Sequence, residues 1–288
     1  MPASAEPAPP IGGSTHLAGV IGWPVTHSLS PAIHNAAFAS LGMDWVYLPL
    51  PVAPGDLRAA LDGLRSLGFR GANVTMPHKT GSADLADELS DEARRLRAVN
   101  TFVVADDRLR GHNTDAPGFD RFLRRDVGFD PQDRSALIFG AGGAARAVAF
   151  ALAGAGVGEL SVAVRDAGRA TQLLEAVEGT SLRPKVVDFD AAAGMSADLV
   201  VNATPLGADG QTAPPLPSLG PGVVVVDLLY RPSITPLQAA ARSAGAEAHG
   251  GLGLLLHQAA LSFESWTGTP APLEVMSAAA VAALAERR

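Results

Sequence analysis

The chain has 288 residues, of which 47% are hydrophobic and 18% are charged, and these proportions predict a folded, soluble protein of two domains. A net charge of −7 leaves no basic surplus to neutralise a phosphate backbone, which disfavours nucleic acid as a partner. Cysteine is absent, which excludes disulfides, thiolate metal ligands and thiol catalysis and fits a reducing cytoplasm.

No targeting or membrane segment is predicted. The first 15 residues lack the basic start and apolar core of a secretory signal, and we expect a disordered leader there. The most apolar helical windows, residues 144–156 and 278–285, are much shorter than the ~20 residues of a membrane span. We therefore expect a cytoplasmic protein that does not contact a membrane.

In the first part of the chain, β-branched runs alternate with helical stretches, which predicts a mostly parallel sheet covered by helices. The predicted strands are residues 17–22, 45–50 and 71–75, followed by a hairpin of residues 99–105 and 109–112. The predicted helices are residues 31–41, 56–67, 84–96 and 117–125. Ser30 is the expected N-cap of the first helix because Pro31 follows it, and Gly68 is the expected end of the second.

The second part repeats this alternation. A strand at 136–139, a glycine turn and a helix at 144–154 precede further strands at 159–164, 185–187, 199–203 and 223–228. Further helices are predicted at 170–177, 236–245, 252–266 and 273–286. We predict an α/β protein with an open α/β substrate domain (residues 16–115 and 252–288) and a Rossmann-like dinucleotide-binding domain (residues 116–251). The final helices are expected to return to the first domain.

The glycine turn predicts a dinucleotide site. Gly140-Ala141-Gly142-Gly143-Ala144-Ala145 fits the G-x-G-x-x-G/A form between a strand and a helix. Its glycines permit a tight turn and close approach of the backbone to a diphosphate at the helix N-terminus. A bare structural turn is the alternative.

The end of the next strand indicates which dinucleotide binds. Arg165 and Arg169 stand where an NAD site usually has an acidic residue, and two guanidinium groups suit a 2′-phosphate. We therefore predict NADP(H). Asp166 opposes this assignment because it could pair with Arg169 or repel the phosphate, and a solvated charged loop is the alternative.

Polar groups gather at the ends of two early strands, as in small-molecule sites of open α/β sheets. Ser28 and Ser30 follow the first strand, and the stretch from Asn73 to Lys79 follows the third. Reduction of a carbonyl needs a proton donor at the oxygen, and Lys79 with Asp115 as partner is the predicted pair. Considered alone, a lysine after a strand is usually a surface charge, and an aspartate after a threonine is commonly a helix cap. His34, His112 and His257 lie near these motifs, but no cluster of carboxylates or second histidine stands at metal-ligand spacing, so no metal site is expected.

Together these motifs resemble the shikimate dehydrogenase family. The family's His-Ser-x-Ser-Pro turn matches residues 27–31, its Asn-Val-Thr-x-Pro-x-Lys stretch residues 73–79, its Asn-Thr pair residues 100–101 and its Asn-Thr-Asp residues 113–115. Further matches are Gly-Ala-Gly-Gly-Ala at 140–144, Asn-Ala-Thr-x-x-Gly at 202–207, Asp-x-x-Tyr-x-Pro at 227–232, Thr-Pro-Leu at 235–237 and Gly-x-x-Leu-x-x-x-Gln at 251–258.

The resemblance implies the NADPH-dependent, reversible reduction of 3-dehydroshikimate to shikimate in chorismate biosynthesis. It implies that Ser28 and Ser30 bind the carboxylate and that Lys79 and Asp115 form the catalytic pair. Ring hydroxyls would be bound by Asn73, Asn100, Asp115 and Gln258, with Thr75 and Tyr230 as further contacts. The cofactor would be bound by Gly140, Ala141, Gly142, Gly143, Ala144, Arg165, Arg169, Thr204, Leu228, Gly251 and Leu254.

Two departures and three alternatives accompany this reading. Leu254 stands where many relatives have Met, and Asp166 where Thr or Ser is commoner. A quinate/shikimate or an aminoshikimate-pathway dehydrogenase is the alternative within the family, although Ser30 favours shikimate because some quinate-preferring relatives have Thr there. A non-catalytic NADP-sensing protein is disfavoured by the intact Lys79 and Asp115. A monomer or homodimer is expected.

Overall fold

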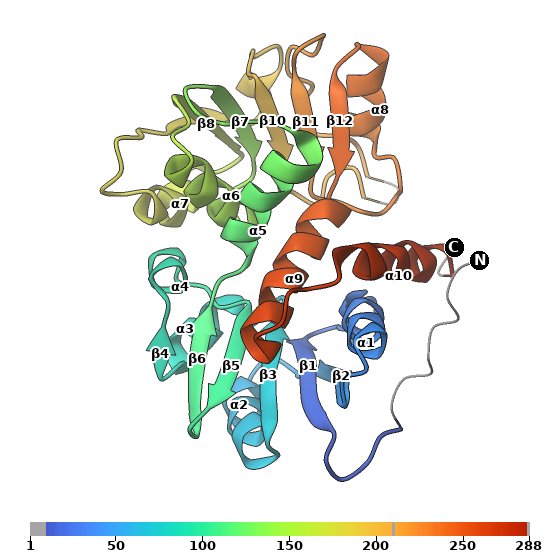
Figure 1. Cartoon of the computed structure of the whole chain (residues 1–288). Coiled ribbons are helices and arrows are strands. Elements are labelled where there is room, and N and C mark those ends of the chain that lie inside the picture. The colour runs from blue at the N-terminus through green and yellow to red at the C-terminus, as the bar shows by residue number, and fades with distance from the viewer. Residues whose placement is uncertain (1–9, 209–210, 287–288) are drawn as a thin grey trace, which may run out of the picture. The chain divides into compact units, whose positions relative to one another are not determined.

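The computed structural model describes residues 10–208 and 211–286, which belong to two compact units (Figure 1). Unit 1 comprises Met1–Thr114 and Leu256–Arg288, and unit 2 comprises Asp115–Leu255. The junctions predicted from the sequence are at residues 115/116 and 251/252.

The expected disordered leader needs a correction at its end. Residues 1–9 lie outside the described residues, but Ser14 and Thr15 donate side-chain hydrogen bonds of 2.7 and 2.6 Å to the carboxylate of Asp44. The bond from Thr15 and then that from Ser14 lower the pKa of Asp44. The two oxygens of Asp44 thus tie this stretch to the loop before the second strand.

Among the described residues, unit 1 has a six-stranded sheet in the order β2-β1-β3-β5-β6-β4. Its strands are β1 (His16–Gly22), β2 (Trp45–Pro51), β3 (Phe69–Val74), β4 (Glu88–Leu89), β5 (Thr101–Ala105) and β6 (Arg108–His112). Strand β1 is parallel to β2 and β3, whereas β5 is antiparallel to both β3 and β6. The predicted hairpin is confirmed, since β5 and β6 are joined by Asp106 and Asp107 with φ of 52° and 59°.

Helices cover both faces of this sheet. They are α1 (Ser30–Ser40), α2 (Leu57–Ser66), α3 (Lys79–Leu85), α4 (Asp91–Leu96), α9 (Leu252–Thr267) and α10 (Leu273–Ala285). On one face, Ile21 and Phe102 pack with Leu61 and Leu64 of α2. On the other face, Phe38 of α1 contacts Phe263 of α9, with ring centroids 5.2 Å apart. Helix α10 packs on α1 (Figure 1).

The single helix predicted over residues 84–96 is wrong. The chain instead forms α3, the short strand β4 and then α4. Ser90 caps α4 by accepting a hydrogen bond from the Ala93 N–H at 3.2 Å, and Glu88 and Leu89 pair with β6. The helical pattern of residues 84–96 is therefore interrupted by the Ser90 cap and by the edge strand β4, which forms by pairing with β6.

Unit 2 has a parallel sheet in the order β12-β11-β10-β7-β8-β9, six strands among the described residues. Its strands are β7 (Ser135–Phe139), β8 (Glu159–Val164), β9 (Lys185–Asp188), β10 (Leu199–Asn202), β11 (Val224–Asp227) and β12 (Glu247–Gly250). Its helices are α5 (Asp115–Phe122), α6 (Gly143–Gly154), α7 (Thr171–Ala176) and α8 (Pro236–Ser243), with a π turn at Leu123–Val127 and 3-10 turns at Ala167–Ala170 and Asp190–Ala192. This strand order is that of the Rossmann fold, with its reversal between β7 and β10.

Strand β12 was not predicted. Its sequence, Glu-Ala-His-Gly, contains no β-branched residue, and the strand forms by pairing in parallel with β11. The core of unit 2 lies on both faces of the sheet: Ile138 and Val162 pack with α5, α6 and α7, and Leu137 and Phe139 pack with Leu237 of α8.

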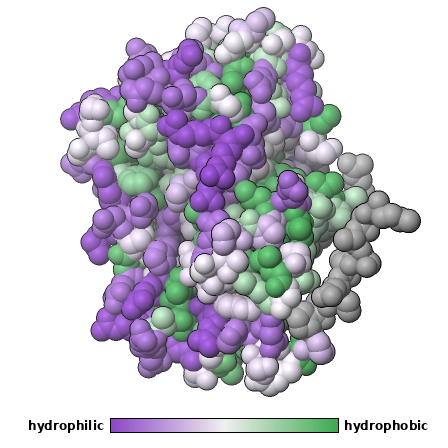
Figure 2. All heavy atoms as spheres, in the orientation of Figure 1, coloured by the Kyte–Doolittle hydropathy of each residue, from purple (hydrophilic) through white to green (hydrophobic). Residues whose placement is uncertain are grey.

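In the described part of the chain, no helix is both long enough and apolar enough to cross a membrane. The face in Figure 2 is largely hydrophilic, with hydrophobic residues interspersed.

Candidate active site

The two serines predicted to bind a carboxylate lie at the start of α1. Ser30 is its first residue and is buried, and Ser28 is half-buried. The prediction of Ser30 as N-cap is wrong, because Leu29 takes that position without a side-chain cap. The Ser28 hydroxyl instead accepts a hydrogen bond from the Ser30 N–H at 3.2 Å, and the Ser30 side chain lies beside Tyr47 and acts to lower the pKa of its hydroxyl.

Asn73, in β3, is 5% exposed and its amide is held at both ends. The Tyr47 hydroxyl donates to Asn73 Oδ1 at 2.7 Å. Asn73 Nδ2 donates to Ser262 Oγ at 2.9 Å and has contacts of 3.1 Å with the Asn100 carbonyl and with Thr101 Oγ1. The amide orientation is thus set by groups from β2, β5 and α9.

Lys79 is the first residue of α3 and is half-buried. The turn before it is closed by a hydrogen bond of 3.0 Å from the His78 N–H to the Thr75 carbonyl, and His78 Nε2 lies 2.7 Å from the Val52 carbonyl. The Lys79 carbonyl accepts from the Val99 N–H at 2.9 Å. The backbone of Lys79 is therefore anchored one residue before Asn100.

Asn100 and Gln258 belong to the same buried network. Asn100 Oδ1 accepts from the Thr114 N–H at 2.7 Å, and its Nδ2 donates to Thr114 Oγ1 at 3.0 Å and reaches Gln258 Oε1 at 3.5 Å. The hydroxyls of Thr101 and Ser262 are 2.8 Å apart, and Ser262 donates to the Gln258 carbonyl at 3.0 Å. Unit 1 thus brings together four predicted substrate-binding residues: Ser30, Asn73, Asn100 and Gln258.

Sequence reasoning did not assign a role to Tyr47 or Ser262. Both are buried, and burial raises the pKa of the Tyr47 hydroxyl well above its usual value, which keeps it a donor. The His34 ring stacks on Tyr47, with centroids 4.4 Å apart, and burial lowers the pKa of His34 to about 3, against a smaller opposite effect of Asn73. Ser262 could have been found, since it lies one helical turn after Gln258 on the same face of α9.

Asp115, the predicted partner of Lys79, is the first residue of α5 and is 8% exposed. It follows Thr114, which bonds to Asn100. Lys79 belongs to unit 1 and Asp115 to unit 2, and their pairing stays a prediction.

The glycine turn follows β7, at the reversal of the strand order in unit 2. Gly140 has a φ of +103°, and a Cβ there would lie 3.0 Å from Thr204 Cγ2, so this position requires glycine. No atom lies within 4 Å of a Cβ placed on Gly142, the N-cap of α6. For Gly143 the nearest atom is Arg146 Nη2 at 3.8 Å. Open backbone at a helix start fits a diphosphate.

The predicted 2′-phosphate site follows β8. Arg165 and Arg169 are both exposed, and the guanidinium carbon of Arg165 lies 5.8 Å from the ring centroid of Phe189. The Asp166 carboxylate accepts a hydrogen bond of 2.9 Å from the Gly168 N–H, which caps the short 3-10 turn there. Asp166 therefore has a local structural role.

The remaining predicted cofactor and substrate contacts of unit 2 lie near the ends of β10, β11 and β12. Leu228 and Leu254 are partly buried against the core that also contains Ile138 and Val162. Gly251 approaches the Leu228 carbonyl so closely that a Cβ would overlap it. Tyr230 is half-buried, and Ala141, which lies in the glycine turn after β7, packs on the same core.

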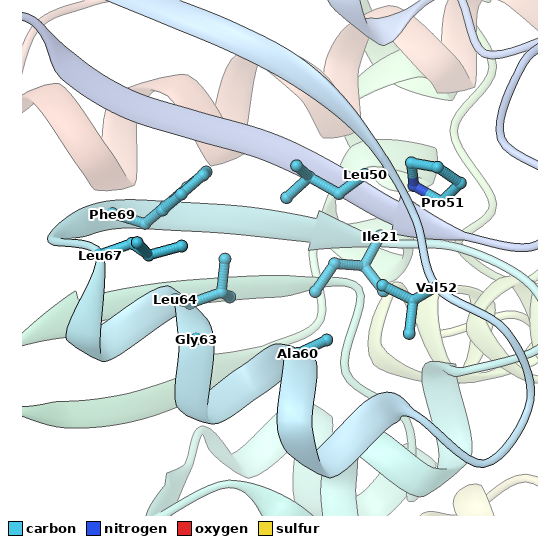
Figure 3. Close-up of a pocket in the computed structure, with 9 residues that line it drawn as sticks. All are labelled: Ile21, Leu50, Pro51, Val52, Ala60, Gly63, Leu64, Leu67 and Phe69. Atoms are coloured by element: carbon cyan, nitrogen blue, oxygen red, sulfur yellow. The ribbon is translucent and has the colours of Figure 1, made fainter.

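An apolar cavity of about 280 Å³ in unit 1 is separate from this polar network (Figure 3). It is lined by Ile21, Leu50, Pro51, Val52, Ala60, Gly63, Leu64, Leu67 and Phe69, between the sheet and α2. These side chains offer no charged or hydrogen-bonding group. A polyhydroxylated acid would therefore not be recognised there.

Comparisons with known proteins agree with the motifs. Residues 20–102 match the family described as the shikimate dehydrogenase substrate binding domain, and residues 251–281 match the shikimate 5′-dehydrogenase C-terminal domain. The shikimate dehydrogenase (NADP+) of Moorella thermoacetica is 50% identical over 271 residues, which cover 91% of this chain and 92% of that protein.

Solved structures show the same similarity across both units. Shikimate 5-dehydrogenase from Thermus thermophilus, in complex with NADP(H) and shikimate, has a TM-score of 0.84 and 39% identity, covering 93% of this chain and 100% of that one. Quinate dehydrogenase from Corynebacterium glutamicum, in complex with NAD, has a TM-score of 0.86 and 34% identity, covering 93% and 99%. The predicted fold class, an α/β protein with a Rossmann-like dinucleotide domain, is confirmed, and the chain belongs to the shikimate dehydrogenase family.

Proposed function

We propose that this chain catalyses the reversible, NADPH-dependent reduction of 3-dehydroshikimate to shikimate, a step of aromatic amino acid biosynthesis. One observation carries the proposal: the buried network that joins Asn73, Asn100 and Gln258 in unit 1, with Ser30 beside its Tyr47. A polyhydroxylated ring acid needs many neutral donors and acceptors, and a buried network of hydroxyls and amides supplies them. Curated relatives at up to 50% identity are named shikimate dehydrogenase (NADP+), which supports the same activity.

The substrate contacts are proposed on this geometry. Ser28 and Ser30, at the N-terminus of α1, bind the carboxylate, where the helix dipole favours negative charge. Ring hydroxyls are bound by Asn73, Asn100, Asp115 and Gln258, with Thr75 and Tyr230 as further contacts. An analogue that lacks one hydroxyl leaves a buried amide without a partner and is therefore rejected.

Lys79 and Asp115 are proposed as the catalytic pair. Bound NADPH supplies the hydride for the ketone carbon. The Lys79 ammonium, positioned by its place at the start of α3, donates the proton to the ketone oxygen and stabilises the charge that develops there. Asp115 orients Lys79 and a ring hydroxyl. In the reverse direction, Lys79 accepts the proton.

For the cofactor, residues 140–144 are proposed to hold the diphosphate, and Arg165 with Arg169 the 2′-phosphate. Thr204, Leu228, Gly251 and Leu254 are proposed as the remaining contacts. Residues 16–115 with 252–288 form the proposed substrate domain and residues 116–251 the cofactor domain. A cytoplasmic monomer or homodimer completes the proposal.

The test is NADPH formation from shikimate and NADP+, measured by absorbance for the unmodified chain and for Lys79→Ala. Turnover should be lost in Lys79→Ala while shikimate still binds. Lys185→Ala is the matched control, because Lys185 is an exposed residue at the start of β9, and it should retain turnover. Quinate, aminoshikimate and NAD+ are assayed in parallel. Faster turnover of quinate than of shikimate would reassign the substrate. If no substrate is turned over with either cofactor, a non-catalytic NADP-sensing protein would be favoured.

A further inference from the structure

Two polar side chains at the ends of neighbouring strands in unit 2 have no role in the site described above. Asn202 ends β10 and Asp227 ends β11, and the two residues are directly paired across the parallel strands. Both are 0% exposed. A buried carboxylate and a buried amide are costly unless their hydrogen bonds are satisfied, so what they bind is informative.

The Asn202 amide uses its full hydrogen-bonding capacity on the loop after β10 and on Asp227. Its Oδ1 accepts from the Thr204 N–H at 3.1 Å and from the Thr204 hydroxyl at 2.7 Å. Its Nδ2 donates to the Leu206 carbonyl at 2.9 Å and to Asp227 Oδ1 at 3.0 Å. An amide makes four such bonds at most. Asn202 therefore determines where Thr204 lies.

The Asp227 carboxylate closes the loop after β11. Its Oδ1 accepts from the Leu229 N–H at 3.1 Å, and its Oδ2 accepts from the Thr235 hydroxyl at 2.6 Å. The segment between these two attachments contains Tyr230, and Leu228 lies just before it. The two loops are joined to each other through the bond between Asn202 and Asp227.

Thr235 extends this network to α8. It is the N-cap of α8 in a capping box, in which its hydroxyl accepts from the Gln238 N–H at 3.3 Å and its N–H donates to Gln238 Oε1 at 2.8 Å. The three donors to Asp227 are neutral, so the carboxylate is held by directed hydrogen bonds. Burial raises the pKa of Asp227, and the bonds from Thr235, Leu229 and Asn202 act in the opposite direction.

The location of these loops gives the network a function. They follow two strands on the β10 side of the strand-order reversal, at the sheet edge where Rossmann folds bind dinucleotides. Thr204 forms one wall of the glycine turn, since its Cγ2 would lie 3.0 Å from a Cβ at Gly140. We propose that Asp227, through Asn202 and Thr235, is a positioning residue that holds Thr204 and Leu228 in the geometry that binds NADP(H). This inference rests on the proposed cofactor site.

The test compares NADPH affinity with thermal stability. In Thr235→Val, Asp227 loses one donor while the shape of the side chain is kept, and NADPH binding measured by nucleotide fluorescence should weaken about tenfold. Thr235→Ser should restore the affinity. Thr180→Val is the matched control, because Thr180 also donates to an oxygen, the Val177 carbonyl at 2.7 Å, and accepts from a backbone N–H, that of Leu182 at 3.3 Å. It should lower Tm without changing the NADPH Kd.

The outcomes separate a positioning role from a structural one. A folded Thr235→Val protein with lowered Tm and unchanged NADPH Kd would overturn the proposal. If that variant does not fold, Thr235→Ala replaces it: it removes the same donor to Asp227 without placing a methyl group against the carboxylate, and unchanged NADPH affinity again refutes positioning. An unmodified chain that fails to bind NADPH would overturn the cofactor assignment together with this inference. An unmodified chain that binds NADPH but does not oxidise shikimate with NADP+ would reject only the proposed activity.

Discussion

Removal of the Tyr47 hydroxyl tests whether the buried network of unit 1 orients the substrate site. In Tyr47→Phe, Asn73 Oδ1 loses the donor at 2.7 Å. A buried acceptor without its partner costs about 1–3 kcal/mol, so the free energy of unfolding should fall by that amount. If the amide of Asn73 also becomes free to reorient, the KM for shikimate should rise about tenfold, which corresponds to about 1.4 kcal/mol.

The assay combines urea unfolding with steady-state kinetics in both substrates. The KM for NADP+ should not change, because the proposed cofactor residues belong to unit 2. Trp266→Phe is the matched control: it removes the indole hydrogen bond of 2.8 Å to the Phe102 carbonyl in the same aromatic cluster but has no bond to Asn73. It should lose similar stability with an unchanged KM for shikimate. Equal KM values for Tyr47→Phe and the unmodified chain, with Asn73→Ala impaired, would refute the reasoning.

Three further predictions concern stability, cofactor choice and pH. Gly63 lies within α2 and lines the apolar cavity in Figure 3, and no atom lies within 4 Å of a Cβ placed there. Because alanine favours a helix more than glycine does, Gly63→Ala should stabilise the chain by about 1 kcal/mol in thermal unfolding. A lower Tm for this variant would mean that the cavity beside Gly63 has no room for a methyl group. Replacing Arg165 and Arg169 together by Ala should raise the KM for NADP+ at least about tenfold and leave the KM for NAD+ within about twofold of its original value. An equal rise of the two KM values would reject a 2′-phosphate site. The folded pKa of His34, about 3, lies below its unfolded value of 6.5, so its contribution to stability is complete above pH 6.5 and is lost as pH falls towards 3. His34→Phe cannot titrate and should reduce the pH slope of the unfolding free energy by up to about 1.4 kcal/mol per unit between these values; an unchanged slope would show that His34 is not the titrating group.

Much of the architecture could be predicted from the sequence because it depends on neighbouring residues. The run Ala136–Phe139, the turn at Gly140 and the Ala-rich helix that follows are local signals, and they correspond to β7, the turn and α6. The hairpin at Asp106 and Asp107 was predictable for the same reason, since two residues that tolerate positive φ separate two strand-like runs. Where local signals were weak, as in Glu247–Gly250, or interrupted, as at Ser90, the prediction failed.

The motifs in the sequence predicted a set of site residues without Tyr47 and Ser262, and the hydrogen bonds among these residues were decided by the tertiary structure. Tyr47 and Asn73 are 26 residues apart, and Asn73 and Ser262 are 189 apart, yet both pairs form hydrogen bonds. No local periodicity encodes such pairs, because they depend on the strand order β2-β1-β3 and on the packing of α9 over that sheet. The contact between Asn202 and Asp227 likewise exists because β10 and β11 lie side by side in register. Turn, cap and periodicity are properties of a short segment, whereas hydrogen bonds between strand ends arise only after the sheet has assembled.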